Sequence, residues 1–341
     1  RREADAESSS YDLRIPVPEG LHYEDLRMEN HYFTKKLVVR LRTGREDFYR
    51  KRPISCDFSK VKEAVCEKGE KDLTLSFTLN KVYDFDVDLT GGMISLHFLP
   101  VAGRYTHLVL LDPSAEPGEN AQVSLLIARK MVKLSRQEGD SIRFFISRTG
   151  EDAPTDSEVE RFISETGADR YLRLSARKEL PAQTSNVQEQ ETQTADVREQ
   201  GVQTSDVQEQ ETQTADVQEQ GAQTADMREQ GAQEDAACMI KARTLYSDSY
   251  YIRNFGNVAF ANTMEEALYH GGGFEPLGLM ADPDPSSLLH HLRILGAQVE
   301  LGADCLEQET GEEDKKQEDI LNQAAAALYE GLVQSYEQAE H

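Results

Sequence analysis

The chain has 341 residues, with 62 Asp and Glu against 37 Lys and Arg, and a formal net charge of −25. Such acidity favours solubility and disfavours binding of the whole chain to nucleic acid or to an anionic membrane surface. The sequence has no Trp and no apolar run long enough to span a bilayer. Its apolar content is low, so part of the chain is expected to remain outside any core.

Residues 1–12 are polar and predict a flexible lead-in, whereas residues 13–104 predict a β-rich region. Apolar and polar residues alternate through 73–79 and 83–89, the period of half-buried strands, and a third such segment follows at 94–98. Asn80-Lys81 and Gly91-Gly92 permit short turns between them. The pattern predicts an antiparallel meander.

Residues 105–180 predict a small α/β layer in the order β-α-β-α-β. The predicted strands are 106–111, 141–147 and 171–175, and the longer helix runs from about 120 to 137. Thr155 and Glu158 form a capping-box pattern that opens a second helix, which Gly167 is expected to end.

Residues 181–237 contain five decamers, at 182–231, that share the pattern xQTxxxxEQx. Each decamer has about one sizeable apolar residue, which is too few for a coiled-coil seam. The composition predicts a disordered tandem repeat that acts as a spacer and an exposed epitope, with a small-unit solenoid as the alternative.

Residues 238–341 predict a mixed, mainly helical C-terminal region, so the overall fold class is α+β. Asp284-Pro285 is expected to open a helix over 286–295, which Gly296 would stop, and a final helix is expected over 320–338. The sequence leaves open whether the repeat separates two domains or interrupts one.

Two acidic motifs invite a metal interpretation. Asp84, Asp86 and Asp88 alternate on one strand but lack the Gly and Glu of an EF-hand loop, so a solvated sheet face is favoured. Asp112-Pro113-Ser114-Ala115-Glu116 resembles a degenerate metal motif of von Willebrand factor A domains, with Glu116 in place of the final Ser. The alternative function is therefore a divalent-metal-dependent α/β module centred on Asp112 and Ser114.

A basic segment stands out in this acidic chain and predicts a partner-binding surface. Arg and aromatic residues are frequent anchors of interfaces, and pairing with the protein's own carboxylates is the competing interpretation. The segment contains Lys35, Lys36, Arg40, Arg42, Arg45, Phe48, Tyr49, Arg50, Lys51 and Arg52.

Four cysteines are present, and none forms a CxxC pair or has a His at zinc-ligand spacing. Cys56 and Cys66 both fall in the β-rich region, where a hairpin-like return would bring them together. If the protein is exported, they are expected to form a disulfide that contributes about 2–3 kcal/mol.

The segment VQEQETQTADVREQG (187–201) resembles the repeat region of treponemal outer-surface lipoprotein adhesins that bind host fibronectin. The resemblance implies an exported cell-surface protein of the outer membrane, held by a lipid anchor that lies outside this chain. With no catalytic motif visible, the sequence predicts a non-enzymatic adhesin without a cofactor, whose folded N-terminal region binds fibronectin or another matrix protein.

Overall fold

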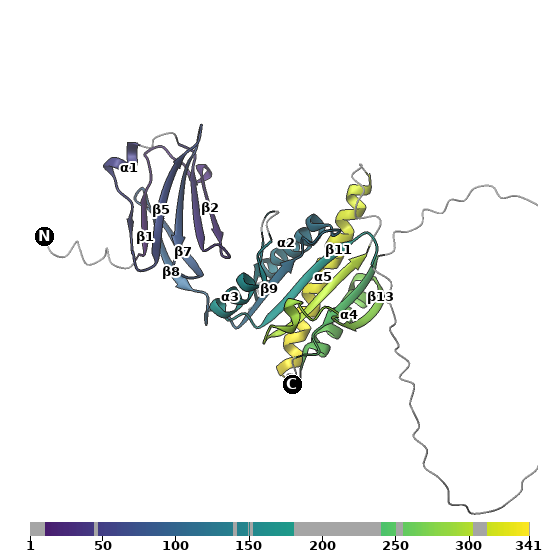
Figure 1. Ribbon diagram of the computed structural model, residues 1–341. Coiled ribbons are helices and arrows are strands. Elements are labelled where there is room, and N and C mark those ends of the chain that lie inside the picture. Colours follow the sequence, from purple (N-terminus) through teal and green to yellow (C-terminus); the bar gives the residue numbers. More distant parts are fainter. Residues whose placement is uncertain are drawn as a thin grey trace, which may run out of the picture. The chain divides into compact units, whose positions relative to one another are not determined.

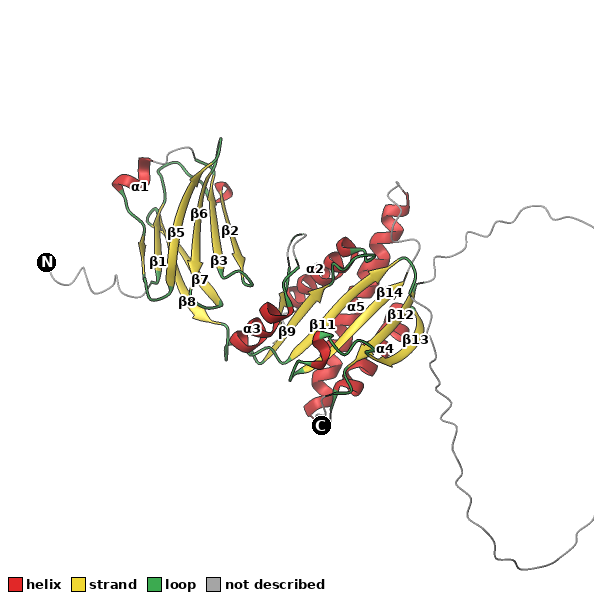
Figure 2. Ribbon diagram, viewed as in Figure 1, coloured by secondary structure: helices red, strands yellow, loops and turns green. Residues whose placement is uncertain are grey.

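The computed structural model describes residues 11–43, 47–138, 142–148, 150, 153–180, 240–249, 255–302 and 312–340 (Figures 1 and 2). The predicted repeat and residues 1–10 of the predicted lead-in lie outside these ranges. The last lead-in residue, Asp12, is instead part of the fold, because it is buried and forms an ion pair with Lys60. Among the described helices, none combines the length and apolar character needed to cross a membrane.

The N-terminal region is built from two four-stranded antiparallel sheets. The first has the order β4-β1-β8-β7, with strands Ser55–Cys56, Leu13–Pro16, Met93–Pro100 and Tyr83–Thr90. The second has the order β2-β3-β6-β5, with strands Leu26–His31, Lys36–Leu41, Leu73–Leu79 and Val61–Lys68. Inward residues of both sheets, such as Ile15 and Phe77, form one apolar cluster, so the predicted β-rich region is confirmed.

The predicted meander is wrong in one respect. The three strands form as expected, but β6 belongs to one sheet and the β7–β8 hairpin to the other. Leu75 and Phe77 are buried on β6, and so are Ile94 and Leu96 on β8. Alternation predicts which face of a strand is buried, but it does not predict which sheet the strand joins.

The second part of the fold is a six-stranded sheet with the order β10-β9-β11-β14-β12-β13. Its strands are β9 His107–Pro113, β10 Ile142–Ile146, β11 Arg170–Arg177, β12 Lys241–Tyr246, β13 Glu275–Ala281 and β14 Leu295–Gly302. The first four strands of this order, β10, β9, β11 and β14, are parallel to one another. Strand β12 is antiparallel to β14, and β13 is parallel to β12. Strands from both sides of the repeat therefore build one sheet, so the repeat interrupts this layer.

Helices α2 Ala121–Glu138, α4 Asn257–Gly272 and α5 Glu312–Glu340 pack on one face of this sheet (Figure 2). Helix α3 Asp156–Thr166 and the short 3-10 helix η3 Leu288–His290 contribute apolar residues to a separate cluster with Tyr171 and Leu245. The predicted helix starts and stops of α3 are confirmed: Glu158 accepts a hydrogen bond from the Thr155 amide at 2.9 Å, and Gly167 takes the left-handed conformation that favours glycine.

One predicted helix is wrong. Residues 286–294 contain only the short η3, and Leu295 and Gly296 already belong to β14. The Asp284 carboxylate accepts hydrogen bonds from the amide and hydroxyl of Ser286, which makes a local turn. The chain then enters β14, because pairing of Leu295–Gly302 with β11 and β12 satisfies its backbone.

Helices α4 and α5 approach each other closely at Gly331, and this contact gives a testable prediction. A Cβ at Gly331 would lie 2.9 Å from Met264 Cε and 3.0 Å from Ala267 Cβ. Although Ala normally stabilises a helix interior relative to Gly, we expect Gly331→Ala to lower the free energy of unfolding by about 1–3 kcal/mol through overpacking. Urea denaturation measures this loss.

Gly150→Ala is the matched control, since no heavy atom lies within 4 Å of the position that its added methyl group would take. It should unfold like the parent. Equal stability of Gly331→Ala and the parent would show that the two helices separate without cost.

Candidate functional site

The connections of the six-stranded sheet create a point where ligands commonly bind. From β9 the chain passes through α2 to β10 on one side, and it then returns through α3 to β11 on the other side of β9. The strands that follow β9 and β11 along the chain, β10 and β12, therefore lie on opposite sides of this pair. In open α/β sheets, such a crevice at the carboxyl ends of the strands is the usual ligand site.

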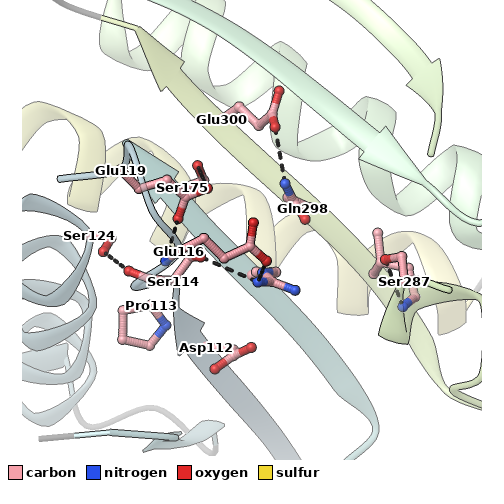
Figure 3. A network of polar contacts seen from close by, with 12 residues as sticks. Asp112, Pro113, Ser114, Glu116, Glu119, Ser124, Ser175, Ser287, Gln298 and Glu300 are labelled. Atoms are coloured by element: carbon pink, nitrogen blue, oxygen red, sulfur yellow. Dashed lines mark hydrogen bonds and ion pairs between the residues drawn. The ribbon is translucent and has the colours of Figure 1, made fainter. Parts of the chain in front are cut away.

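Alternation along β11 places polar side chains on one face at this point. Leu172, Leu174 and Ala176 belong to the apolar cluster under α2, α4 and α5. The intervening Arg173, Ser175 and Arg177 must therefore point to the opposite face. They contact polar residues of the loop after β9, and Arg173 and Ser175 are the register partners of Gln298 and Glu300 on β14. Together with Asp112 of β9 we call this set the carboxyl-edge site; Figure 3 shows its Asp, Ser, Glu and Gln members.

Asp112, near the end of β9, is held by two hydroxyl donors. Tyr171 OH donates to Asp112 Oδ2 at 2.5 Å, and Ser147 Oγ donates to Oδ1. Burial, followed by the nearby Asp112 carboxylate, raises the pKa of Tyr171 well above its ordinary value. Tyr171 therefore remains a hydrogen-bond donor to Asp112.

The two glutamates of the loop after β9 pair with the arginines of β11. Glu116 forms an ion pair with Arg173 and Glu119 accepts from Arg177 Nη2 at 2.8 Å. The Glu119 carboxylate also accepts from Ser175 Oγ at 2.7 Å. The two pairs differ in accessibility, because the Glu116 side chain is 54% exposed and that of Glu119 only 2%.

Arg173 is the central cation of the carboxyl-edge site. Its Nη2 lies 3.3 Å from Ser114 Oγ as well as contacting Glu116. Burial lowers the pKa of Arg173, but the oxygens of Tyr171, Asp112 and Glu116 outweigh this effect and place the pKa above its ordinary value. The guanidinium is therefore fixed, charged and 17% exposed.

A second ion pair lies on the neighbouring strands. Arg243 of β12 and Glu300 of β14 are direct cross-strand neighbours. Arg243 Nε donates to Glu300 Oε2 at 2.9 Å, and Gln298 Nε2 donates to Glu300 Oε1 at 3.1 Å. Both charged side chains are nearly inaccessible, at 5% and 6% exposed. This buried ion pair joins β12 to β14 on the side of the site away from β9.

The predicted metal module at Asp112 and Ser114 is wrong. Each carboxylate of the carboxyl-edge site is already paired with hydroxyl or guanidinium donors. Within the described ranges, no three His, Cys, Asp or Glu side chains are grouped so that they could hold a metal ion. Ser114 is buried, and its backbone amide donates to Leu174.

The basic segment of the N-terminal region is dispersed over several elements. Lys36 and Arg40 lie on β3, whereas Phe48, Tyr49, Arg50 and Lys51 form helix α1 Asp47–Lys51. Arg42 and Arg52 follow these two elements, Lys35 precedes β3, and Arg45 lies outside the described residues.

Several of these residues pair within the protein. Lys35 Nζ lies 2.5 Å from Glu165 Oε1, Arg40 3.3 Å from Glu29 and Arg50 3.6 Å from Asp47. Tyr49 OH donates to the Pro16 carbonyl at 3.0 Å. A role for this segment in binding a partner stays a prediction.

The expected disulfide is not formed in this structure. Cys56 lies on β4 and Cys66 on β5, and these strands belong to different sheets. Both side chains are thiols. A hairpin-like return between the two strands, on which the expectation depended, does not exist.

Sequence reasoning located Asp112, Ser114 and Glu116 but missed their partners. Arg173, Ser175 and Arg177 alternate with buried apolar residues, and Gln298 and Glu300 do the same on β14. A polar face on a strand that is otherwise buried was the signal that could have found them. On β14 it was hidden by the expected helix over 286–295.

Comparison with known proteins gives only distant structural matches. No protein-family model and no curated protein sequence matches the chain. A solved catalytic domain of an N-acetylmuramoyl-L-alanine amidase from Bacillus (Paenibacillus) polymyxa var. colistinus is similar, with 11% identity, a TM-score of 0.41 and coverage of 68% of this chain and 99% of that one.

Two further matches are amidases of the same kind. The N-acetylmuramoyl-L-alanine amidase of Nostoc punctiforme has 14% identity and a TM-score of 0.39, covering 68% of this chain and 97% of that one. The N-acetylmuramyl-L-alanine amidase of Mycobacterium smegmatis has 13% identity and a TM-score of 0.41, covering 71% and 100%. Likeness at this level does not assign an activity.

The matches nevertheless contradict the function expected from the repeat. All three structures are N-acetylmuramoyl-L-alanine or N-acetylmuramyl-L-alanine amidases, and none is an adhesin. The predictions of a treponemal lipoprotein adhesin, of a non-enzymatic chain and of host fibronectin as partner are therefore corrected. The repeat resembled an adhesin over a short segment, whereas the folded part of the chain has different neighbours.

Proposed function

We propose that the α/β part of the chain binds a carboxylate-bearing, peptide-like ligand at the carboxyl-edge site. The observation that carries this proposal is the Glu116–Arg173 ion pair at the switch point. Its cation is fixed by burial, whereas its anion is more than half exposed on a loop. A ligand carboxylate can therefore replace Glu116 on Arg173 without rebuilding the site.

The exchange has a small energetic cost and a chemical preference. An ion pair with an exposed partner contributes only about 0–1 kcal/mol, so displacement of Glu116 is cheap. The planar guanidinium of Arg173 favours a carboxylate through two parallel hydrogen bonds. Glu116, once released, can accept a hydrogen bond from an amide or amino group of the same ligand. A compound with both groups, such as a peptide, satisfies both residues.

The site contains further fixed groups that would orient such a ligand. Ser114 Oγ lies next to Arg173, and Ser175 is held by Glu119. Gln298 is half-buried on the adjacent β14 strand, anchored by its hydrogen bond to Glu300. These side chains lie on rigid strands or are tied to them, which limits the entropy lost on binding.

Titration calorimetry with N-acetylmuramoyl-L-alanine and with its carboxamide tests the proposal. This compound appears in the names of the matched enzymes and carries the required carboxylate and amide groups. The expectation that it binds is based on Glu116 and Arg173. We expect the acid to bind and the carboxamide to bind about 10–100-fold more weakly, because a hydrogen bond to a charged group contributes about 1.5–3 kcal/mol.

Arg173→Lys should reduce binding of the acid to a similar degree, since Lys cannot present the paired donors of Arg. Arg293→Lys is the matched control at an exposed arginine and should bind like the parent. Equal affinity of the parent for acid and carboxamide, or unchanged binding by folded Arg173→Lys, would rule out this ligand mode. Release of L-alanine in the same samples would extend the proposal to catalysis.

A further inference from the structure

A second polar cluster lies at the opposite edge of the six-stranded sheet. Strands β12 and β13 run antiparallel to β14, so their carboxyl ends lie away from the carboxyl-edge site. Ser247 and Ser249 follow β12, Asp282 follows β13, and His290 ends the 3-10 helix η3. The carboxyl-edge site uses none of these residues.

His290 is held in one orientation with its Nδ1 atom toward the two serines. His290 Nε2 lies 3.1 Å from the carbonyl oxygen of Asp282, which can only accept a hydrogen bond. The proton therefore lies on Nε2, and Nδ1 presents its lone pair. Ser249 Oγ lies 2.9 Å from Nδ1 and Ser247 Oγ lies 3.1 Å from it.

The two serines differ in accessibility. Ser247 is 2% exposed and its Oγ also accepts from the Ser249 amide at 3.3 Å. Ser249 is exposed, whereas the His290 side chain beside it is only 8% exposed. The Asp248 carboxylate lies 3.9 Å from Nδ1. A solvent-facing hydroxyl thus meets a buried, oriented imidazole.

We propose that Ser249 is a nucleophile activated by His290 and that it takes acyl groups from small esters. A hydroxyl, a base within hydrogen-bonding distance and a third group that orients the base are the elements of nucleophilic catalysis. Ser249 Oγ forms a bond to the acyl carbon while the ester C–O bond breaks. The Oγ proton passes to Nδ1 and then to the leaving alcohol, and water hydrolyses the acyl-serine by the same route.

A fluorophosphonate probe on the full chain tests this step directly. Ser249 Oγ forms the P–O bond, the P–F bond breaks, fluoride leaves and the proton passes to His290. We expect one label per chain, and fragmentation of the labelled peptide should place it on Ser249 rather than Ser247. Ser249→Ala should lose the label, and hydrolysis of p-nitrophenyl acetate should fall to the level without protein.

Two further variants test whether Ser249 reacts because His290 activates it or only because its hydroxyl is exposed. His290→Gln leaves the hydroxyl but removes the base, and labelling should slow roughly 100-fold or more. Ser247→Ala removes the competitor for the single Nδ1 lone pair, so it should label at least as fast as the parent. Circular dichroism confirms that each variant is folded.

The site of the label in the parent decides the proposal even if His290→Gln does not fold. A label on another serine, a label spread over many serines, or equal labelling of the parent and Ser249→Ala would overturn it. Unchanged labelling of folded His290→Gln would overturn it as well.

Discussion

Replacing Glu300 by Ala is expected to lower the free energy of unfolding by about 3–5 kcal/mol, because it removes the carboxylate that Arg243 contacts in a buried position. The two side chains face each other across β12 and β14 and are 5% and 6% exposed. Little water can reach the guanidinium in place of the carboxylate. Urea denaturation followed by circular dichroism measures the change.

Two comparisons separate the effect of burial from that of losing an ion pair. Glu116→Ala removes a pair whose carboxylate is 54% exposed, and it should cost no more than about 1 kcal/mol. The double variant Arg243→Met with Glu300→Leu removes both charges and should recover much of the loss. If Glu300→Ala is as stable as Glu116→Ala, the buried pair does not hold β12 to β14.

This pair also shows why local patterns were insufficient for the C-terminal part. Arg243 and Glu300 are direct neighbours in the sheet although 57 residues separate them. Strands β11 and β14 pair although the whole repeat separates them in sequence. Leu174 of β11, for example, is the register partner of Val299 of β14. Nothing in either segment alone indicates its partner, because strand pairing depends on the apolar faces that the complete sheet buries.

The parts that sequence predicted well are those with local causes. The final helix and the helix over 120–137 form because their apolar residues recur at helical spacing. The capping box at Thr155 and the glycine stop at Gly167 act within one turn. The carboxyl-edge site was predicted only in its β9 half, since Arg173 and Glu300 come from other strands.

The metal interpretation of Asp112 and Ser114 failed for the same reason. The motif was judged from neighbours along the chain, and it lies at the predicted strand–loop–helix junction. Tyr171 and Arg173 donate hydrogen bonds to the side-chain oxygens of Asp112 and Ser114, respectively, and both donors come from β11. Partners that are distant in sequence decided the chemistry of the motif.

The loop after β9 is also fixed by Arg148, and this gives the second large stability prediction. Arg148 is 4% exposed. Its Nε donates to the Pro113 carbonyl at 2.6 Å, and its Nη2 donates to the carbonyls of Ser114 at 2.9 Å and Ala121 at 2.6 Å. Its Nη1 donates to the carbonyl of Gly150 at 2.7 Å. One side chain thus ties the loop to the start of α2.

We expect Arg148→Met to lower the free energy of unfolding by about 3 kcal/mol or more, since four carbonyls lose a charged hydrogen-bond donor together. Burial lowers the pKa of Arg148, while Asp112 and Glu119 favour its charged form. Arg148→Lys keeps a charge but lacks the forked donors. It should therefore be intermediate between Arg148→Met and the parent.

The control is Arg161→Met at an exposed position of α3, which should change stability by less than about 0.5 kcal/mol. Hydrogen exchange locates the effect, because loss of Arg148 should speed exchange at the amides of Ser114, Glu119 and Asn120, whose backbone hydrogen bonds hold this loop. The same variant should weaken binding of a carboxylate ligand, since Glu116 and Ser114 would no longer be held beside Arg173. If Arg148→Met unfolds like the control and protects these amides like the parent, the loop is fixed by other contacts.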